Sequence, residues 1–177
     1  MYQTISEIYE ANDKVRTKLK GIVANLSDEQ VNALPEGEKW TVKEFVEHIS
    51  IVDEGIVRIS AKLLNASKEN GKTADGAAKF SEAFIEKTTA GRHAKFEAPE
   101  RVRPTGTKSI AESLAKMDET RQKLEELRSL FESVECSEAK FPHPAFGDMT
   151  AHEWLLLLGG HEAKHIRQIE GVLEKIG

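Results

Sequence analysis

Two histidines near the end of the chain have the spacing of metal ligands. His161 and His165 are four residues apart, so a helix would place their Cβ atoms roughly 5–6 Å from each other on one face. They also continue an apolar stripe of Leu158, Ile169 and Val172, which predicts that both rings face inward. Two buried imidazoles without partners would leave ring nitrogens unsatisfied, at roughly 1–3 kcal/mol each. A metal ion removes that cost, because neutral imidazole is the commonest metal ligand.

A third ligand is then needed, and elimination narrows the choice. The other histidines of the chain are His48, His93, His143 and His152. His152 would lie about 13 Å from His161 along the helix axis and would point to a different face. His93 and His143 fall in expected loops, where the sequence alone does not place them.

His48 lies inside an earlier helical segment, at the edge of its apolar stripe. It is the helical candidate that could face the last helix, so we predict a three-histidine site of His48, His161 and His165. One or more coordination positions would stay open for water or substrate. The plainer interpretation is that a histidine at a stripe edge is a core or boundary residue.

The segment 161–165 also matches the H-E-x-x-H pattern of zinc proteases. The extended metzincin form has Gly and His where this chain has Gln168 and Gly171, and no strand pattern accompanies the helix, which disfavours a protease. Glu162 would lie about 60° around the helix from His165. It could act as a general base at a metal site, or it could be an ordinary surface glutamate.

Two further polar residues interrupt apolar stripes. Arg121 falls within the stripe of the third long helix, and Asn12 fills a gap in that of the first. Arg121 could bind an anionic substrate, but a buried ion pair or a drift of the stripe around the helix would explain it equally well. Asn12 could line the site. Both are candidate substrate-binding residues.

Apolar residues recur at helical spacing almost throughout, and no segment alternates like a half-buried strand. The pattern predicts long helices over about 4–26, from Thr41 to a break at 70–72, from 107 or 109 to about 134, and from Thr150 to about 176. Short helices are expected after Ser27 and after Asp75. The segment 89–107 is interpreted as a crossover loop and 141–148 as a tight loop. These elements predict an all-α four-helix bundle with long crossover connections and one or two short extra helices.

The composition limits the class of protein. The 177 residues contain 39% hydrophobic and 31% charged residues, which suits a single domain over 1–177. The net charge is −5 without a basic stripe, which disfavours nucleic-acid binding. No apolar run is long enough to span a bilayer. The single cysteine, Cys136, excludes an internal disulfide framework, and with no secretory signal in the sequence we expect a cytoplasmic protein.

Two segments carry a resemblance to a known family. The segment 39–49 (KWTVKEFVEHI) resembles the first signature of the DinB/YfiT-like superfamily. The segment 143–150 (HPAFGDMT), followed by Glu153–Trp154 and by 161–169 (HEAKHIRQI), resembles the second. Their order and separation fit a DinB-like domain across nearly the whole chain.

The resemblance implies a four-helix bundle that holds a divalent metal through three histidines. Carried over by motif, these are His48, His161 and His165, the same three residues reached by elimination, whereas the loop that contains His143 looks structural. Similar proteins include metal-dependent hydrolases and transferases or isomerases that use low-molecular-weight thiols. The resemblance thus implies a hydrolase or a thiol S-transferase that acts on a small molecule.

Ligand type alone does not choose the metal, since three imidazoles suit Zn, Ni, Fe or Cu. The metal would lower the pKa of bound water toward about 7, and equally that of a thiol cofactor. The alternative is a non-catalytic metal-binding or small-molecule-binding bundle in which the metal staples the helices. Amphipathic helices are also compatible with a homodimer.

Overall fold

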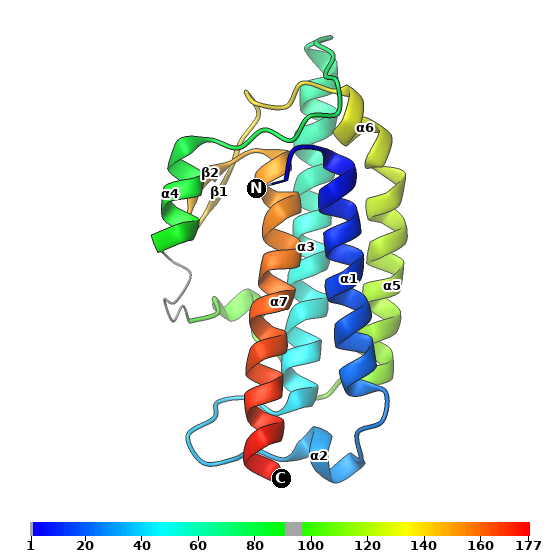
Figure 1. Ribbon diagram of the computed structural model, residues 1–177, viewed down its shortest axis with the longest axis vertical. Coiled ribbons are helices and arrows are strands. Elements are labelled where there is room, and N and C mark those ends of the chain that lie inside the picture. Colours follow the sequence, from blue (N-terminus) through cyan, green and yellow to red (C-terminus); the bar gives the residue numbers. More distant parts are fainter. Residues whose placement is uncertain (1, 91–96) are drawn as a thin grey trace.

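Four long helices lie side by side and form the body of the molecule (Figure 1). The computed structural model describes residues 2–90 and 97–177. The long helices are α1 (Ile5–Val23), α3 (Val42–Glu69), α5 (Ile110–Glu126) and α7 (Ala151–Ile176). The predicted all-α four-helix bundle is confirmed.

The topology of the bundle contains one long crossover. Helices α1 and α7 run in one direction, and α3 and α5 run in the other (Figure 1). Because α3 and α5 are consecutive long helices and parallel, the segment 70–109 has to return along the bundle between them. It contains α4 (Glu82–Ala90) and the 3-10 turn η2 (Glu100–Val102). Part of the predicted crossover loop, residues 91–96, lies outside the described residues.

Shared capping chemistry sets where the helices begin. In five of them a Ser or Thr hydroxyl accepts a hydrogen bond from the backbone N–H three residues later, and the Glu or Gln at that position accepts one from the N-cap N–H. The capping residues are Thr4, Ser27, Thr41, Ser109 and Thr150. Each such cap typically contributes about 1 kcal/mol, because it satisfies backbone donors that the helix leaves free.

Four shorter elements complete the described chain. They are α2 (Asp28–Asn32), α6 (Arg128–Ser133), β1 (Phe141–His143) and β2 (Gly147–Met149). The two strands form an antiparallel hairpin that pairs Phe141 with Met149, where the sequence predicted only a tight loop. Three-residue strands are too short to show an alternating pattern, so the prediction missed them.

The third long helix ends earlier than predicted. The N–H of Leu127 donates to the carbonyl of Leu124 at 3.1 Å, a 3-10 contact, and the chain then starts the separate helix α6. Leu124 and Phe131 are seven residues apart and both remain buried in one apolar cluster. This seven-residue spacing is the same as within one continuous helix, so the apolar pattern did not reveal the break.

The short helix predicted after Asp75 begins later, at Glu82. The carboxylate of Asp75 instead accepts a bond from the N–H of Ala77 at 3.1 Å, which closes a turn. The N–H of Ala78 then donates to the carbonyl of Gln3 at 2.8 Å. The backbone donors that an early helix would need are thus occupied by the N-terminal segment.

The core consists of two apolar clusters with a polar layer between them. One cluster includes Ile8, Ile56, Leu124 and Leu158, and the other includes Leu19, Ile49, Met117 and Ile166. The polar layer contains Asn12 and Arg16 of α1, Asp53 of α3 and Glu162 of α7, all buried.

Arg16 is the centre of this layer. Its guanidinium donates to Glu162 through Nε–Oε2 at 3.0 Å and Nη2–Oε1 at 2.6 Å, and to Asp53 Oδ2 at 2.7 Å. Its Nη1 donates to the carbonyl of Met117 on α5 at 3.1 Å. The Arg16 side chain, which belongs to α1, therefore forms hydrogen bonds to each of the other three long helices.

Of the two carboxyl groups in this layer, that of Asp53 favours the protonated form. Burial, together with the nearby negative charge of Glu162, raises the pKa of Asp53 well above its ordinary value. The Oδ1 atom of Asp53 has no hydrogen-bond partner in the described residues, so it can carry this proton without breaking an existing bond. The layer then holds one positive and one negative charge.

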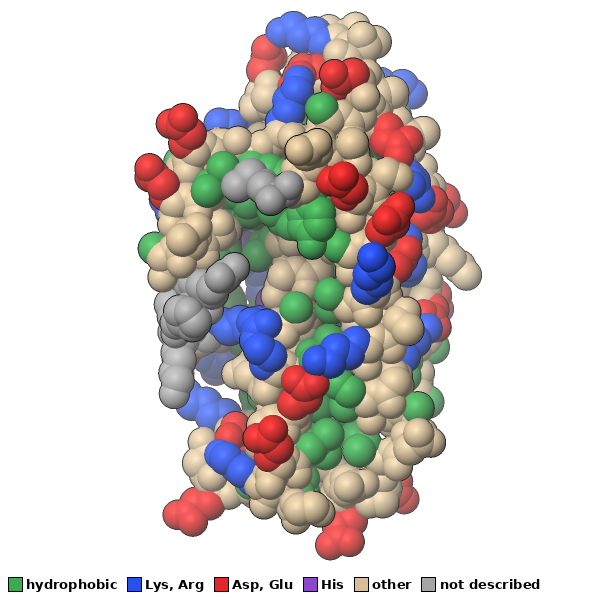
Figure 2. All heavy atoms as spheres, viewed as in Figure 1, with side chains coloured by type: hydrophobic (Ala, Val, Ile, Leu, Met, Phe, Trp, Pro, Cys, Tyr) green, Lys and Arg blue, Asp and Glu red, His purple; other side chains and the backbone are tan. Residues whose placement is uncertain are grey.

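The outer surface of the bundle mixes acidic and basic side chains (Figure 2). Some of them join neighbouring helices, such as Lys20 with Asp118 at 2.5 Å and Lys116 with Glu54 at 2.6 Å. Such exposed pairs contribute at most about 1 kcal/mol each. Among the described residues, no helix combines the length and the hydropathy that crossing a membrane requires.

The buried layer predicts opposite outcomes for two substitutions. Arg16→Met leaves two carboxyl groups buried without their cation, so we expect a loss of about 3–5 kcal/mol in the free energy of unfolding. Asp53→Asn keeps the shape and the neutral charge of a protonated aspartate, so we expect a change below about 1 kcal/mol. Urea unfolding at pH 7.5 measures both. A large loss in Asp53→Asn would contradict the protonated assignment.

Candidate metal centre

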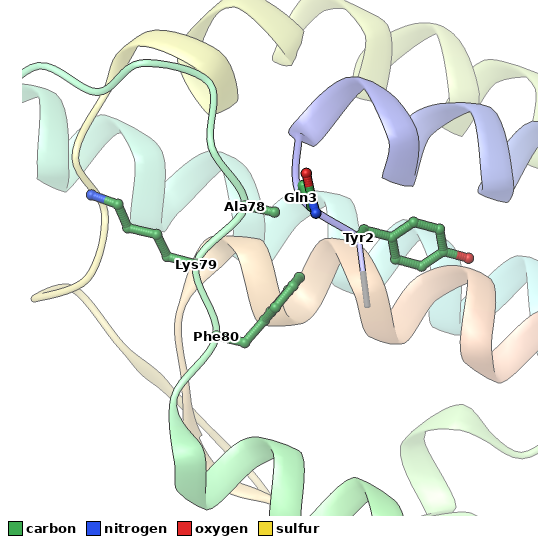
Figure 3. Close-up of a pocket in the computed structure, with 5 residues that line it drawn as sticks. All are labelled: Tyr2, Gln3, Ala78, Lys79 and Phe80. Atoms are coloured by element: carbon green, nitrogen blue, oxygen red, sulfur yellow. The ribbon is translucent and has the colours of Figure 1, made fainter.

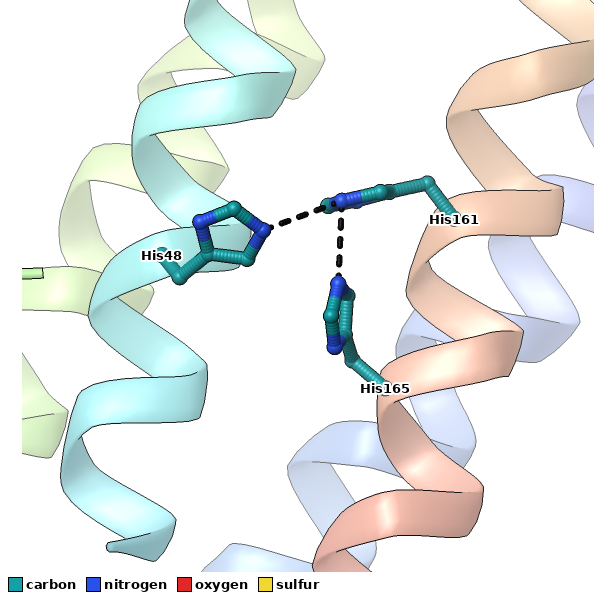
Figure 4. Close-up of side chains that lie close together, drawn as sticks. All are labelled: His48, His161 and His165. Atoms are coloured by element: carbon teal, nitrogen blue, oxygen red, sulfur yellow. Dashed lines mark hydrogen bonds between the residues drawn. The ribbon is translucent and has the colours of Figure 1, made fainter. Parts of the chain in front are cut away.

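Three imidazoles from two helices converge at one point. His48 on α3 and His161 and His165 on α7 turn toward each other across the α3–α7 contact (Figure 4). The Nε2 atom of His161 lies 3.1 Å from Nε2 of His48 and 3.0 Å from Nε2 of His165. Of the described residues, these three form a group whose ligand atoms all lie within 4.8 Å of one another. The three histidines predicted from spacing are therefore brought together.

The tautomer of His48 is set by a backbone carbonyl. Its Nδ1 lies 2.6 Å from the carbonyl oxygen of Val102, in η2. Because a carbonyl only accepts, Nδ1 carries the hydrogen and Nε2 presents its lone pair to the other histidines. Histidine ligands of metals commonly have this second hydrogen bond, which orients the ring and increases its basicity.

Glu47 holds the segment that supplies this carbonyl. Its side chain is buried, and it accepts hydrogen bonds from Thr105 N at 3.0 Å, Thr105 Oγ1 at 2.6 Å and Gly106 N at 2.8 Å. Burial opposes the charge on Glu47, but these hydrogen bonds outweigh it and lower the pKa of Glu47 below its ordinary value. Adjacent residues of α3, Glu47 and His48, thus anchor the same crossover segment.

Protons alone do not satisfy the three converging nitrogens. With Nδ1 of His48 protonated, a hydrogen on Nε2 of His161 can be donated to His48. That same hydrogen cannot also make a full-strength bond to Nε2 of His165, which is equally close. A cation accepts all three lone pairs at once, and the arrangement is therefore compatible with metal binding.

An extra proton on the cluster is disfavoured by burial. Desolvation lowers the pKa of His48, and desolvation with the charges of His165 and His48 lowers that of His161 far below its ordinary value. The pKa of His165 falls to about 3, again mainly through desolvation. His48 is 3% exposed and His165 is 8% exposed. The site therefore presents neutral imidazoles, the form that binds metals.

Aromatic rings line one side of the cluster. The ring of Trp40 lies 4.8 Å from that of His48, and the ring of Phe45 lies 5.6 Å from that of His165, measured between centroids. Trp40 and Phe45 also contact each other edge-on at 5.4 Å. This wall restricts the rotation of the two histidines and excludes water from that side.

Glu162 faces the polar layer of the bundle. Both of its carboxylate oxygens accept hydrogen bonds from Arg16, at 3.0 and 2.6 Å, and the residue is fully buried. This geometry therefore does not support the general-base role expected for Glu162. It also does not support the alternative that Glu162 is an ordinary surface glutamate.

Asn12 contributes to helix packing. Its Nδ2 donates to the carbonyl of Leu155 at 3.1 Å. A Cβ placed on Gly159 would lie 2.0 Å from Oδ1 of Asn12, so α1 and α7 approach each other closely because residue 159 is glycine. The structure thus shows Asn12 in a contact between two helices, and its expected role in lining a substrate site stays a prediction.

Arg121 forms the ion pair that the sequence left open as one of its interpretations. Its Nε and Nη2 donate to the two carboxylate oxygens of Asp13 at 2.6 and 2.9 Å, and its Nη1 donates to Glu125 at 3.0 Å. The guanidinium also lies 5.1 Å from the ring centre of Tyr9. Arg121 therefore joins α1 to α5, and the structure does not place it with the histidine cluster.

Two of the remaining histidines have structural partners. His152 accepts a bond from the N–H of Lys79 and donates to the carbonyl of Phe131, both at 3.2 Å. Nδ1 of His143 accepts bonds from two backbone N–H groups in the β1–β2 turn, and its ring stacks on Phe146 at 4.7 Å. His93 lies outside the described residues.

A broad surface hollow lies near the N-terminus and does not include the histidines. It is lined by Tyr2, Gln3, Ala78, Lys79 and Phe80 and has a volume of about 730 Å³. Lys79 points away from its other lining residues (Figure 3) and pairs with Glu135. The hollow is therefore separate from the histidine cluster.

Sequence reasoning missed the residues that surround the ligands. Arg16 could have been noticed, because it lies four residues after Asn12 and three before Leu19 on the buried face of α1. Asp53 occupies the same kind of position between Ile49 and Ile56 on α3. The carbonyl of Val102 leaves no signal in residue type, since every residue has a carbonyl.

The fold and the site together define a class: a four-helix bundle with one long crossover and a buried cluster of three histidines between two of its long helices. A family model described as the DinB superfamily matches residues 11–169, which include all three histidines. The chain belongs to the DinB superfamily, as its motifs indicated.

The chain is also similar to known proteins in sequence and in structure. The uncharacterized protein YuaE of Bacillus subtilis (strain 168) is 31% identical over 169 residues, which cover 94% of this chain and 95% of that protein. The crystal structure of TT2238, a four-helix bundle protein, matches with a TM-score of 0.64 at 19% identity. That match covers 94% of this chain and 98% of TT2238, and it supports the fold alone.

The lowered histidine pKa values predict an acid-sensitive metal-free protein. His165 has a pKa of about 3 when folded, against 6.5 for an ordinary histidine, so its contribution to stability is present above pH 6.5 and is lost as the pH falls toward 3. We expect the chelator-treated protein to lose a few kcal/mol of unfolding free energy over this range, and His165→Gln to lose less. Urea unfolding at several pH values measures the difference, and equal pH slopes in both proteins would contradict the assignment.

Proposed function

We propose that the chain binds a divalent transition metal through His48, His161 and His165 and uses it in a reaction of a small molecule. The observation that carries the proposal is the convergence of three neutral Nε2 atoms whose lone pairs cannot all be satisfied by hydrogen. All three ligands are imidazoles, which suit Zn, Ni or Fe. Three protein ligands with open positions are typical of catalytic sites.

The ligand set and the family support the proposed reaction class. When bound, the metal would supply Lewis acidity, which makes water or a thiol more acidic. We therefore propose a metal-dependent hydrolase or a transferase that uses a low-molecular-weight thiol. In either case His48, held by the carbonyl of Val102, and the Trp40–Phe45 wall keep the ligand rings in place and exclude water from one side.

A structural role for the metal, as a staple between α3 and α7, is the second candidate. The apolar contacts that surround the cluster argue against it, because Phe45 and Ile49 of α3 already pack in one cluster with Ile166 and Ile169 of α7. Removal of the metal should therefore leave the bundle folded. Circular dichroism before and after chelation tests this, and unfolding on chelation would favour the staple.

Metal stoichiometry tests the ligand set directly. We expect one divalent ion per chain by elemental analysis of the purified protein after reloading. His161→Ala removes a direct ligand, so its metal affinity should fall by more than the roughly 10- to 100-fold expected for an outer partner. Glu170→Ala, on the same helix but at the surface, is the matched control. Equal affinity in His161→Ala and the control would refute the site.

A second prediction concerns Glu47. In Glu47→Gln one acceptor becomes an NH₂ group that cannot accept a hydrogen from Thr105 or Gly106, so the segment that supplies the Val102 carbonyl is released from His48. We expect metal affinity to fall by about 10- to 100-fold with the helix content unchanged. Glu54→Gln, also on α3 but paired with exposed Lys116, should bind metal normally. Isothermal titration with Zn²⁺ measures all three proteins.

A further inference from the structure

Glu162 shares its helix with two of the proposed metal ligands. On the helical wheel of α7, His161 and His165 lie about 40° apart, and Glu162 lies to one side of both, about 60° from the nearer one. Because α7 is continuous over Ala151–Ile176, these angles are fixed. Any rotation of α7 that moves the carboxyl group of Glu162 therefore moves both imidazoles with it.

The carboxylate of Glu162 is held in a directional contact. Its two oxygens accept hydrogen bonds from Nε and Nη2 of Arg16 at 3.0 and 2.6 Å, and Glu162 is 0% exposed. Two parallel hydrogen bonds between a guanidinium and a carboxylate define an angle as well as a distance. Arg16 is itself held by Asp53 of α3 at 2.7 Å and by the carbonyl of Met117 of α5 at 3.1 Å. The rotation of α7 is thus fixed relative to the other three long helices.

Two further contacts with α1 lie on the same side of α7 as Glu162. Nδ2 of Asn12 donates to the carbonyl of Leu155, and a Cβ on Gly159 would lie 2.0 Å from Oδ1 of Asn12. On the helical wheel Leu155, Gly159 and Glu162 fall within about 60° of one another. The first two contacts involve the backbone of α7, close to the helix axis, so they set the distance between the helices. The contact of Glu162 lies at the end of a long side chain, so it controls the rotation.

Metal coordination is sensitive to such a rotation. A ring nitrogen lies about 6 Å from the helix axis, so a rotation of about 10° moves it by about 1 Å. Metal–nitrogen distances of about 2.0–2.1 Å tolerate changes of only about 0.2 Å. His48 belongs to α3 (Figure 4), so a rotation of α7 alters the 3.1 Å distance between the Nε2 atoms of His161 and His48. The rotation of α7 therefore decides whether one ion can reach all three rings.

Given the proposed metal site, on which this inference rests, we propose that Glu162 is a positioning residue for the metal ligands. Bound to Arg16, it fixes the rotation of α7 and thereby the geometry that His161 and His165 offer to the ion. Its action passes through the helix and needs no contact between its carboxylate and the metal. The glutamate of the H-E-x-x-H pattern would then serve the metal site from the opposite direction to that of a general base.

Cobalt-loaded protein provides the test, because the visible spectrum of Co²⁺ depends on its coordination geometry. In Glu162→Gln the amide NH₂ group cannot accept a hydrogen bond from the guanidinium, so the paired contact is broken, while Arg16 keeps Asp53 as a partner. We expect altered absorption bands and an affinity for Co²⁺ that falls about 10- to 100-fold, as for other outer partners of metal ligands. Arg16→Lys replaces the guanidinium by a point charge, so its bands should change as well.

Two controls separate positioning from stability. Asp53→Asn alters the same buried layer but leaves the contact between Arg16 and Glu162 intact, so its affinity for Co²⁺ should stay within about twofold of the wild type. Leu124→Ala destabilises the bundle in the apolar cluster that contains Ile8 and Leu158, and its absorption bands should be unchanged. Circular dichroism of each variant shows that the helix content is retained.

The outcomes separate the two proposals. Failure of the wild-type chain to bind Co²⁺ would overturn the metal site and this inference with it. Wild-type bands and affinity in folded Glu162→Gln and Arg16→Lys would overturn the positioning role alone. Equal changes in Glu162→Gln and in either control would also overturn it, since the layer would then act on the site only through the stability of the bundle.

Discussion

The contact of Arg16 with Glu162, Asp53 and the carbonyl of Met117 is the interaction on which the arrangement of the bundle depends. It joins the four long helices at one level, between two apolar clusters that could otherwise slide or rotate against each other. Hydrophobic contacts are not directional, whereas a guanidinium fork fixes the position of its partners. We infer that this layer specifies the register of the helices more than it adds stability, as buried ion pairs do in some other proteins.

The same contact sets the orientation of two of the histidines that we propose as metal ligands. On the helical wheel Glu162 lies to one side of both histidines, about 100° from His161 and 60° from His165. Because Arg16 draws Glu162 toward α1, the two histidines turn toward α3 and meet His48. Glu162, which the H-E-x-x-H pattern would make a catalytic base, thus helps to orient His161 and His165.

The crossover connects the topology of the bundle with the chemistry of the site. Two parallel consecutive helices require a return segment, and this one passes over the histidines, where Val102 bonds to His48 and Glu47 holds Thr105 and Gly106. A connection that an up-down-up-down bundle could omit therefore supplies the carbonyl that orients His48.

How much of this structure the sequence predicted depends on how far apart the interacting residues lie along the chain. Helix starts such as Thr41 and Thr150 are encoded within four residues, and they were predicted correctly. The four-residue spacing that places His161 and His165 on one face of α7 is also local in the sequence. The roles of Glu162, Asn12 and Arg121 depend on which residue of another helix lies opposite, and spacing within one helix does not contain that information.

The packing around the histidines bears on whether a metal there would be structural or catalytic. Apolar residues close α3 against α7 beside the cluster, so the scaffold itself holds Nε2 of His161 about 3 Å from Nε2 of each of the other two histidines. In a small domain that folds only with its metal, the ligands gather when the ion binds, and binding energy becomes folding energy. Here the neutral rings are already gathered and kept unprotonated by burial, so the binding energy of an ion is not needed for folding. A preorganised site of this kind can leave coordination positions open to a ligand, which is the condition that catalysis requires.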